Sequence, residues 1–448
     1  MSLILERSLY LLSHLMQHIG DWFFKIASLL ALERLAPDSG RALSALVLAK
    51  TIPPVFISPF GGILADKYDR SMIMLTLDCV GAISVLFFLL AIRLRSLPLF
   101  FTISVIRSTI SALYEPSTKS IIPMIVPEPS SLKRAATING MGWAIMLIFG
   151  GVIAGDLTSY VGLQVSFSID SVTYFISALI ISRLKGNYAV VHRNDVGSPI
   201  RATANPAASP GSMYRLPHAC QLLITFGQMA KELLVYLHNS GFGGVVFLNA
   251  TAAFLWGASD ILNVTVAQIN GNEQETSQRL GYLFSFIGVA YLLGPIAANF
   301  FSNADRPKSV QLVCTSSFVL MTVGWIGLSQ SPSFAVTVGF SFIRGCGSGI
   351  LWINSTLLLQ TLTRPDLLGR VMALEFCLSL LMEAASAVLT GHFLDLGYSA
   401  AQISGGVAVA SAVCTIFWLT FQMLNRGAAR EEFNKCPAVR GETVDMIA

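Results

Sequence analysis

The chain has 448 residues, of which 54% are hydrophobic and only 12% carry a charge. Soluble globular domains carry about 25% charged residues, so this composition excludes a soluble globular protein and requires lipid as the surrounding solvent. The net charge of +4 calls for no nucleic-acid partner, and the 7 scattered cysteines predict neither a disulfide framework nor a metal cluster.

Twelve stretches are long and apolar enough to cross a membrane as helices, which requires about 20 residues each. The first follows Glu6 and Arg7 and is too long for the apolar core of a cleavable signal peptide, so we expect it to stay as a spanning helix. The sequence therefore predicts an all-α polytopic membrane protein. The expected spans are residues 10–32, 43–65, 72–92, 97–125, 135–157, 161–183, 242–267, 279–301, 310–329, 334–359, 371–393 and 402–424.

Basic residues set the expected orientation, because Lys and Arg concentrate in cytoplasmic loops. If both termini are cytoplasmic, most of the 29 Lys and Arg residues fall on the cytoplasmic side. We therefore predict that both ends of the chain face the cytoplasm. The opposite side then collects a small set, Arg34, Arg41, Arg93, Arg95 and Arg279.

A polar segment divides the chain into two parts. The stretch from Asn194 to Pro217 is rich in Pro, Ala, Ser and Gly and cannot bury apolar surface. The following stretch, Ala219 to Tyr236, suits either an amphipathic helix on the membrane surface or an early start of the seventh span. We predict one bundle over residues 1–183, a cytoplasmic linker over 184–241, a second bundle over 242–424 and a cytoplasmic tail over 425–448.

The two predicted bundles look like copies of one unit, because short motifs recur at a nearly constant separation. Parallel repeats of six helices are one architecture of secondary transporters, so we predict twelve transmembrane helices as two six-helix parallel-repeat bundles. The matching pairs are Gly20-Asp21 with Ser259-Asp260, Asp69-Arg70 with Asp305-Arg306, and Val105-Ile106-Arg107 with Phe342-Ile343-Arg344.

The segment between the second and third spans carries the most specific motif, Gly61-Gly62-Ile63-Leu64-Ala65-Asp66-Lys67-Tyr68-Asp69-Arg70. It resembles the pattern G-x-L-A-D-[RK]-x-G-R-[RK] of the major facilitator superfamily, with Asp69 in the place of the usual Gly. The resemblance implies the major facilitator fold. It also implies a conformational latch that closes the cytoplasmic side, formed by Gly62, Asp66, Lys67, Arg70 and Arg370.

Further stretches resemble the efflux branch of that superfamily, which contains the enterobactin exporter and macrolide efflux proteins. They are Ile121–Pro127, Ala135–Gly140, Ser168–Ser171 and Arg364–Leu374. The resemblance implies a secondary active transporter that exports a small organic molecule by alternating access. Aromatic residues that could line a cavity favour an amphipathic substrate; they are Trp22, Phe23, Phe24, Trp143, Trp256 and Trp352. We expect protons as the coupling ion, a monomer in the lipid bilayer, and no cofactor.

Ionisable side chains inside the spans are functional candidates, because each costs about 2.5–3.5 kcal/mol or more to insert. Asp21 and Lys25 lie one turn apart on the first span and can pair. They form either a proton- or cation-linked site in the central cavity or a structural ion pair. Asp260 occupies the related place in the seventh span, with no basic residue one turn away. An unpaired carboxylate there suits a proton carrier, unless it lies in water at the outer end.

Two arginines lie within the fourth and tenth spans. By resemblance, Arg107 matches an Arg thought to take part in proton coupling in antiporters, although Ile110 and Ser111 replace the usual Gln and Gly. Arg344 holds the related place in the second bundle. The alternative for both arginines is a charge clamp that holds a pair of helices.

Two spans carry further buried acids. Glu383 should lie near the midplane of the eleventh span, where it could bind a cation or carry a proton, and Lys50 of the second span is a possible partner. We expect Asp170 of the sixth span to be a structural residue, hydrogen-bonded by the serines beside it.

Two other functions fit parts of the sequence. Gly20-Asp21 is similar to the first helix of the iron exporter ferroportin, and His14 and His18 precede it four residues apart, so a divalent-metal exporter is one alternative. A transporter-like receptor or scaffold that uses the linker and tail is the other. The sequence shows no Walker motif, no nucleophile–base constellation and no cofactor fingerprint, so we predict neither an ATP-driven pump nor an enzyme.

Overall fold

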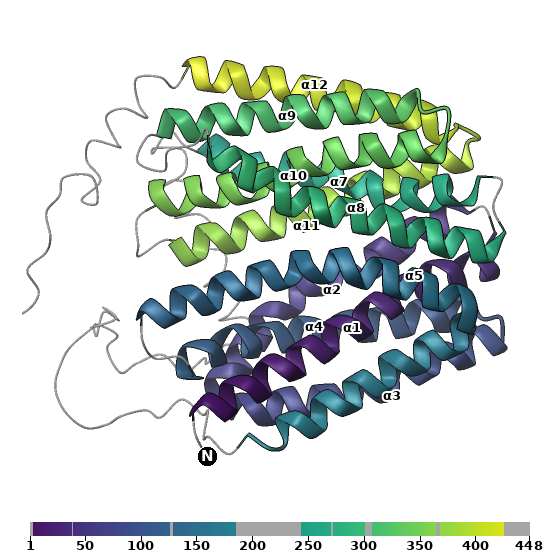
Figure 1. Cartoon of the computed structure of the whole chain (residues 1–448), viewed down its shortest axis with the longest axis vertical. Coiled ribbons are helices and arrows are strands. Elements are labelled where there is room, and N and C mark those ends of the chain that lie inside the picture. Colours follow the sequence, from purple (N-terminus) through teal and green to yellow (C-terminus); the bar gives the residue numbers. More distant parts are fainter. Residues whose placement is uncertain are drawn as a thin grey trace, which may run out of the picture.

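The computed structural model describes residues 3–37, 39–125, 129–184, 243–269, 272–300, 307–363 and 368–424. All the regular structure in these ranges is helical, and the helices run side by side along one direction (Figure 1). The predicted linker and tail lie outside the described residues. The helices are α1 (Leu3–Leu35), α2 (Gly40–Lys67), α3 (Arg70–Arg93), α4 (Leu97–Ile125), α5 (Pro129–Ile181), α7 (Gly243–Gln268), α8 (Glu273–Asn299), α9 (Pro307–Ser329), α10 (Phe334–Leu362), α11 (Leu368–Asp395) and α12 (Ala400–Leu424).

Helix α5 consists of two helices in series. Gly162 between them has φ 80° and ψ 170°, a conformation that is essentially restricted to glycine, and the chain turns back there (Figure 1). Thr158 and Ser166 share a hydrogen bond of 2.8 Å across this turn. With the two arms of α5 counted separately, the described residues form twelve helical segments, so the predicted all-α fold is confirmed.

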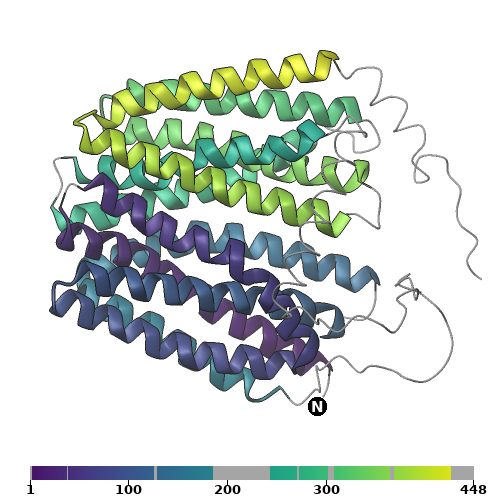
Figure 2. The ribbon, with the colours of Figure 1, turned by 180° about the vertical axis from the view of Figure 1, so that it is seen from behind.

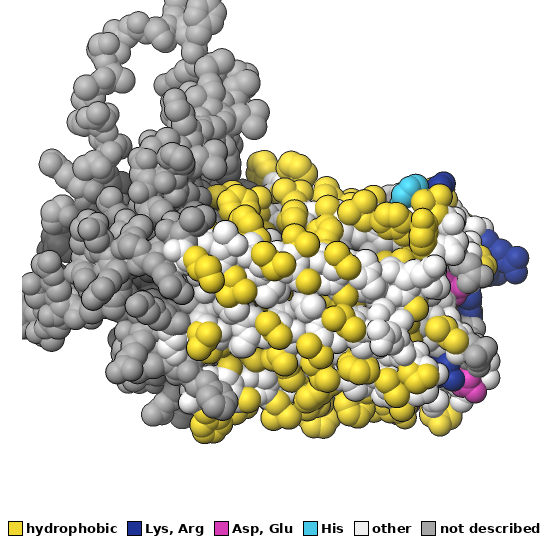
Figure 3. Space-filling model, turned by 90° about the horizontal axis from the view of Figure 1, so that it is seen from above, with side chains coloured by type: hydrophobic (Ala, Val, Ile, Leu, Met, Phe, Trp, Pro, Cys, Tyr) yellow, Lys and Arg dark blue, Asp and Glu magenta, His cyan; other side chains and the backbone are white. Residues whose placement is uncertain are grey.

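The surface of the bundle is mostly apolar, as contact with lipid requires. In the described residues, ten helices are long and apolar enough to span a membrane, with α5 counted once. In the part of Figure 3 that is drawn in colour, hydrophobic side chains are spread along the long side of the molecule, and Lys, Arg, Asp and Glu lie at its end. Helix α1, which carries His14, Gln17, His18, Asp21 and Lys25, is not among the ten. The chain is therefore an integral, multi-pass membrane protein.

The helices fall into two groups, α1–α5 and α7–α12, which we call the N-terminal and C-terminal halves (Figures 1 and 2). The start of α1 and the end of α12 lie at the same end of the bundle, which we call the proximal end. The opposite end, where α1 ends and α2 begins, is the distal end.

Small residues join the two halves at the distal end. Helix α2 packs against α11, and α5 packs against α8. A Cβ on Gly40 would overlap the carbonyl group of Gly391, and one on Gly155 would lie 2.8 Å from the Cα of Gly281. Ser44 donates a hydrogen bond of 2.8 Å to the carbonyl of Ala387. Small residues allow this close backbone approach between membrane helices, and here they hold the distal ends together.

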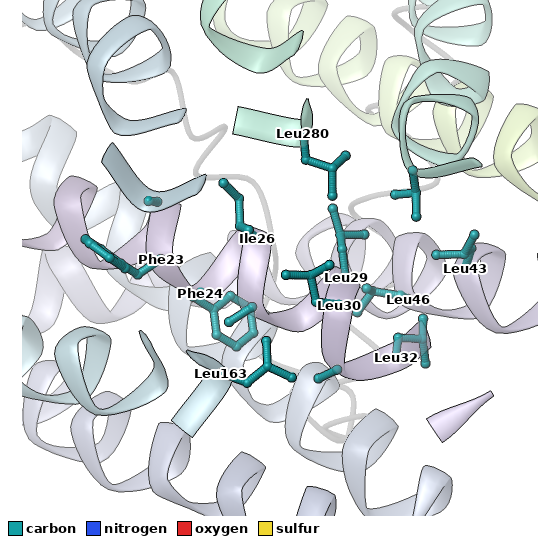
Figure 4. Close-up of a cluster of buried hydrophobic side chains, with 14 of the residues drawn as sticks. Phe23, Phe24, Ile26, Leu29, Leu30, Leu32, Leu43, Leu46, Leu163 and Leu280 are labelled. Carbon is teal, nitrogen blue, oxygen red and sulfur yellow. The ribbon is translucent and has the colours of Figure 1, made fainter. Parts of the chain in front are cut away.

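Apolar side chains fill the space behind these contacts. Helix α1 contributes Phe23, Phe24, Ile26 and Leu29 to a buried cluster that also contains Leu280 of α8 (Figure 4). The cluster therefore spans both halves and makes α1 part of the interior of the bundle.

Candidate functional site

Arg107 of α4 joins three helices of the N-terminal half. Its Nη2 atom lies 2.8 Å from Oδ1 of Asp21 in α1, and its Nη1 atom lies 2.9 Å from Oδ2 of Asp170 in α5. The guanidinium group also lies 3.8 Å from the ring centre of Phe24 and 5.0 Å from that of Tyr174. We call Asp21, Arg107 and Asp170 the N-half triad.

The two carboxylates of the triad differ in how exposed they are. The side chain of Asp170 is 0% exposed, whereas that of Asp21 is 48% exposed. Two carboxylates and one guanidinium carry a net charge of −1 when all are ionised. Of the two carboxylates, that of Asp21 is therefore the accessible one in this conformation.

The triad corrects two expectations. Asp21 does not pair with Lys25, one turn away, but with Arg107 on another helix. Asp170 is held by Arg107 and not by its neighbouring serines; Ser166, for example, donates to the carbonyl of Gly162. The planar guanidinium presents donors in a rigid fork that suits two carboxylates, and the sequence pattern contains no information about which helices face α4.

Lys25 of α1 forms an ion pair with Asp260 of α7 across the two halves. The Nζ atom lies 3.5 Å from Oδ1, and the side chains are only 23% and 12% exposed. The Lys25 ammonium also lies 4.1 Å from the ring centre of Phe284 and 5.3 Å from that of Trp22. The expectation that Asp260 is unpaired is wrong, because its partner comes from the other half and not from its own helix.

A small cavity adjoins this ion pair. Its volume is about 20 Å³, which is room for about one water molecule. Its lining includes Lys25, Lys50, Ser28 and Asp260. Lys50 is exposed here and, within the described residues, forms no ion pair with Glu383. Both groups are close enough to act electrostatically on Lys25 and Asp260.

Arg344 of α10 occupies the place in the C-terminal half that Arg107 occupies in the N-terminal half. It is 1% exposed and donates a hydrogen bond from Nη1 to the hydroxyl of Ser259 in α7. Its guanidinium lies 5.6 Å from the ring centre of Trp256 and 5.0 Å from that of Trp325. Among the described residues, no carboxylate lies within ion-pair distance, and Nε and Nη2 have no hydrogen-bond acceptor.

Three other acids have partners that sequence reasoning missed. The carboxylate of Asp78 accepts hydrogen bonds from Gln17 and Ser177, the latter at 2.7 Å, and that of Glu375 accepts from Asn249 and Ser379. Asp395 at the end of α11 binds the first turn of α2. Ser379 lies one turn after Glu375 on α11, but the other partners come from different helices, and no periodicity marks those pairs.

The histidines that suggested a metal site contact each other. Nε2 of His14 and Nε2 of His18 are 3.1 Å apart, and Asp21 is held by Arg107. Within the described ranges, no group of three or more His, Cys, Asp or Glu side chains could hold a metal ion. Nothing in this arrangement favours the metal-exporter alternative.

The segment that carries the latch motif is mostly helical. Helix α2 continues to Lys67 and α3 begins at Arg70, so only Tyr68 and Asp69 separate them. Asp69 caps α3, because its Oδ1 accepts from the backbone N–H of Ser71 at 2.8 Å. This capping role explains an Asp where the motif usually has Gly.

The partners within the latch stay a prediction. Gly62, Asp66 and Lys67 lie in the last turns of α2, and Arg370 lies in the first turn of α11. The side chains of Asp66, Lys67 and Arg370 are outside the described residues. Arg70 is buried at the start of α3.

Comparison with known proteins decides the family. Residues 10–385 match the model of the Major Facilitator Superfamily. The chain belongs to the Major Facilitator Superfamily. Within the superfamily it is a membrane transporter and not an enzyme, and a small molecule is the substrate that such a transporter moves.

Several members of the superfamily resemble the chain over most of its length. The uncharacterized transporter y4rN of Sinorhizobium fredii is 21% identical over 416 residues, which are 91% of this chain and 93% of that protein. Macrolide efflux protein A of Streptococcus pyogenes is 23% identical over 360 residues, which are 80% and 82% of the two chains. The crystal structure of the nucleoside transporter NupG superposes with a TM-score of 0.68 at 13% identity, covering 93% and 98%. This likeness confirms the major facilitator fold.

Proposed function

We propose that this transporter exports a small amphipathic organic molecule and that protons drive the export. The observation that carries the proposal is the N-half triad, in which two carboxylates share one guanidinium group at membrane depth. Ionisable residues at this depth are costly and usually functional. Uptake of one proton by Asp21 would cancel the net charge of −1 on the triad.

The geometry of the triad links that proton to helix α1. A protonated Asp21 is a weaker partner for Arg107, because the charge-assisted hydrogen bond at 2.8 Å loses its ionic component. The same helix carries Lys25, which ties the N-terminal half to Asp260 of the C-terminal half. A change of charge at Asp21 therefore acts one helical turn away from the contact between the halves.

The relatives support the direction and the kind of substrate. Besides macrolide efflux protein A, the putative bacilysin exporter BacE of Bacillus subtilis is 24% identical over 159 residues, which are 34% of this chain. Aromatic rings also flank the ion pair between the halves. The ring centres of Trp22 and Phe284 lie 5.6 Å apart, and those of Trp256 and Tyr291 lie 5.5 Å apart. Apolar and aromatic walls with few charged groups suit an amphipathic organic ligand.

We further propose that the protein works as a monomer with both termini in the cytoplasm. The two ends of the helical bundle, at the start of α1 and the end of α12, share the proximal end (Figure 1). The predicted cytoplasmic segments carry most of the Lys and Arg residues, as the positive-inside rule requires.

The test is transport into inverted membrane vesicles with an imposed pH gradient, acidic inside. The probes are macrolides, bacilysin and other amphipathic compounds. We expect gradient-dependent accumulation of at least one probe, with loss of this accumulation in Asp21→Asn. Asp156→Asn, which removes a carboxylate at the distal end of α5, is the control and should transport normally. Accumulation that ignores the gradient, or an unaffected Asp21→Asn variant, would overturn proton coupling through Asp21.

A further inference from the structure

A cation and an anion in the C-terminal half stand next to each other without pairing. Arg344 donates to Ser259, and Asp260 is the next residue along α7. Two donors of the guanidinium, Nε and Nη2, have no acceptor in the described structure, and Oδ1 of Asp260 has no hydrogen bond. A buried donor without an acceptor costs free energy, and the cost is greater for a charged group.

The N-terminal half shows the arrangement that this pair could adopt. In the repeat, Arg107 corresponds to Arg344 and Gly20-Asp21 corresponds to Ser259-Asp260. The pair Arg107–Asp21 is formed, at 2.8 Å. The equivalent helices α10 and α7 also contact each other, and Arg344 already reaches the residue before Asp260. The carboxylate of Asp260, however, pairs with Lys25 and not with Arg344.

The competitor for that carboxylate comes from the other half. Lys25 of α1 lies 3.5 Å from Asp260, which is longer than the ion pairs of Arg107 at 2.8 and 2.9 Å. Lys25 follows Asp21 by one turn on α1, and it is the cation that reaches Asp260 in the other half. The equivalent position on α7, one turn after Asp260, is Val264. Helix α7 therefore offers no equivalent cation to Asp21.

We propose that Asp260 exchanges partners during transport. It pairs with Lys25 while the distal ends of the halves are together, and with Arg344 when the distal ends separate. The role of Arg344 is to receive the carboxylate and thereby stabilise the distal-open conformation. The exchange depends on the movement of the two halves against each other and is independent of which ion drives it.

The surrounding charges are compatible with the exchange. When Asp260 leaves, Lys25 still has Asp21 one turn away on its own helix, and Asp21 is half exposed. Glu383 of α11 and Lys50 of α2 face the same region and act on both members of the present pair. Arg344 gains an anion where, within the described residues, it contacts Ser259 and two indole rings.

The experiment measures the distance between spin labels across the distal end, at Arg95→Cys of the N-terminal half and Gln330→Cys of the C-terminal half, after replacement of the native cysteines. We expect Lys25→Gln to raise the ratio of distal-open to distal-closed molecules by about 5- to 150-fold, the usual range of coupling between sites. Arg344→Gln should reverse most of this shift. In the Asp260→Asn background, Arg344→Gln should leave the distances unchanged.

Lys50→Gln is the matched control, because it removes an equal charge from the same cavity but breaks no ion pair among the residues that the structure describes. Opening by Lys50→Gln as large as that by Lys25→Gln would overturn the proposal, and so would an Arg344→Gln variant that leaves the Lys25→Gln shift intact. Thermal unfolding in detergent shows whether each variant is folded. If Arg344→Gln does not fold, Arg344→Lys serves instead and should reverse the shift in part, whereas no reversal would overturn the proposal.

Discussion

Asp395, the last residue of α11, caps the first turn of α2 in the opposite half. Its Oδ1 accepts from the backbone N–H of Gly40 at 2.8 Å, and its Oδ2 accepts from that of Arg41 at 3.2 Å and lies 3.0 Å from Nε of Arg41. The first N–H groups of a helix have no partner within the helix, so one half supplies acceptors that the other half lacks. Separation of the distal ends must break this cap.

Removal of the Asp395 cap should favour the distal-open conformation. Asp395→Ala loses the capping acceptor and the charge at the positive end of the helix dipole, which together cost the closed conformation about 0.5–2 kcal/mol. The measurement is the spin-label distance across the distal end. Asp156→Asn is the control. Identical distance distributions in the Asp395→Ala variant and the unmodified protein would show that the cap does not hold the halves together.

Gly40 should tolerate no side chain. A methyl group there would overlap the backbone carbonyl of Gly391, and a backbone cannot move aside as a flexible side chain can. We expect Gly40→Ala to prevent closure of the distal end and to abolish transport, while membrane insertion and helix content stay normal. Gly406→Ala is the matched control, because nothing lies within 4 Å of the added methyl group. Normal transport by Gly40→Ala would contradict the packing of α2 against α11.

The two carboxylates of the N-half triad should differ in their effect on stability. Removal of one partner from a buried ion pair costs about 3–5 kcal/mol, so Asp170→Ala should lower the free energy of unfolding by that amount. Asp21 is 48% exposed, and solvent-exposed pairs contribute about 0.2–1 kcal/mol. Thermal and denaturant unfolding in detergent should therefore show a large loss for Asp170→Ala and a small loss for Asp21→Ala. Equal losses would mean that Asp21 is as structural as Asp170.

The sequence predicts where the helices lie along the chain, but it does not predict which side chains of different helices pair with each other. Apolar length marks each span, and a polar stretch marks the division, because these properties belong to single segments. Asp260 shows the limit: its spacing on α7 predicted an unpaired carboxylate, yet Lys25 reaches it from α1. Asp395 carried no sequence signal, since a capping carboxylate from another helix follows no period. Asp170 illustrates the same point, because neighbouring serines suggested a local partner and Arg107 of α4 is the actual one.

Asp66 offers a test of the predicted latch at the proximal end. A carboxylate near the start of α11 gains about 0.3–1 kcal/mol from the helix dipole, and Arg370 lies in the first turn of that helix. Asp66→Asn should therefore shift the population away from the proximal-closed conformation by about two- to fivefold and slow transport, with the Kd for substrate unchanged. Asp69→Asn is the control, because Asn caps α3 about as well as Asp. A loss of substrate affinity in Asp66→Asn equal to its loss of transport rate would place Asp66 in substrate binding and not in a latch.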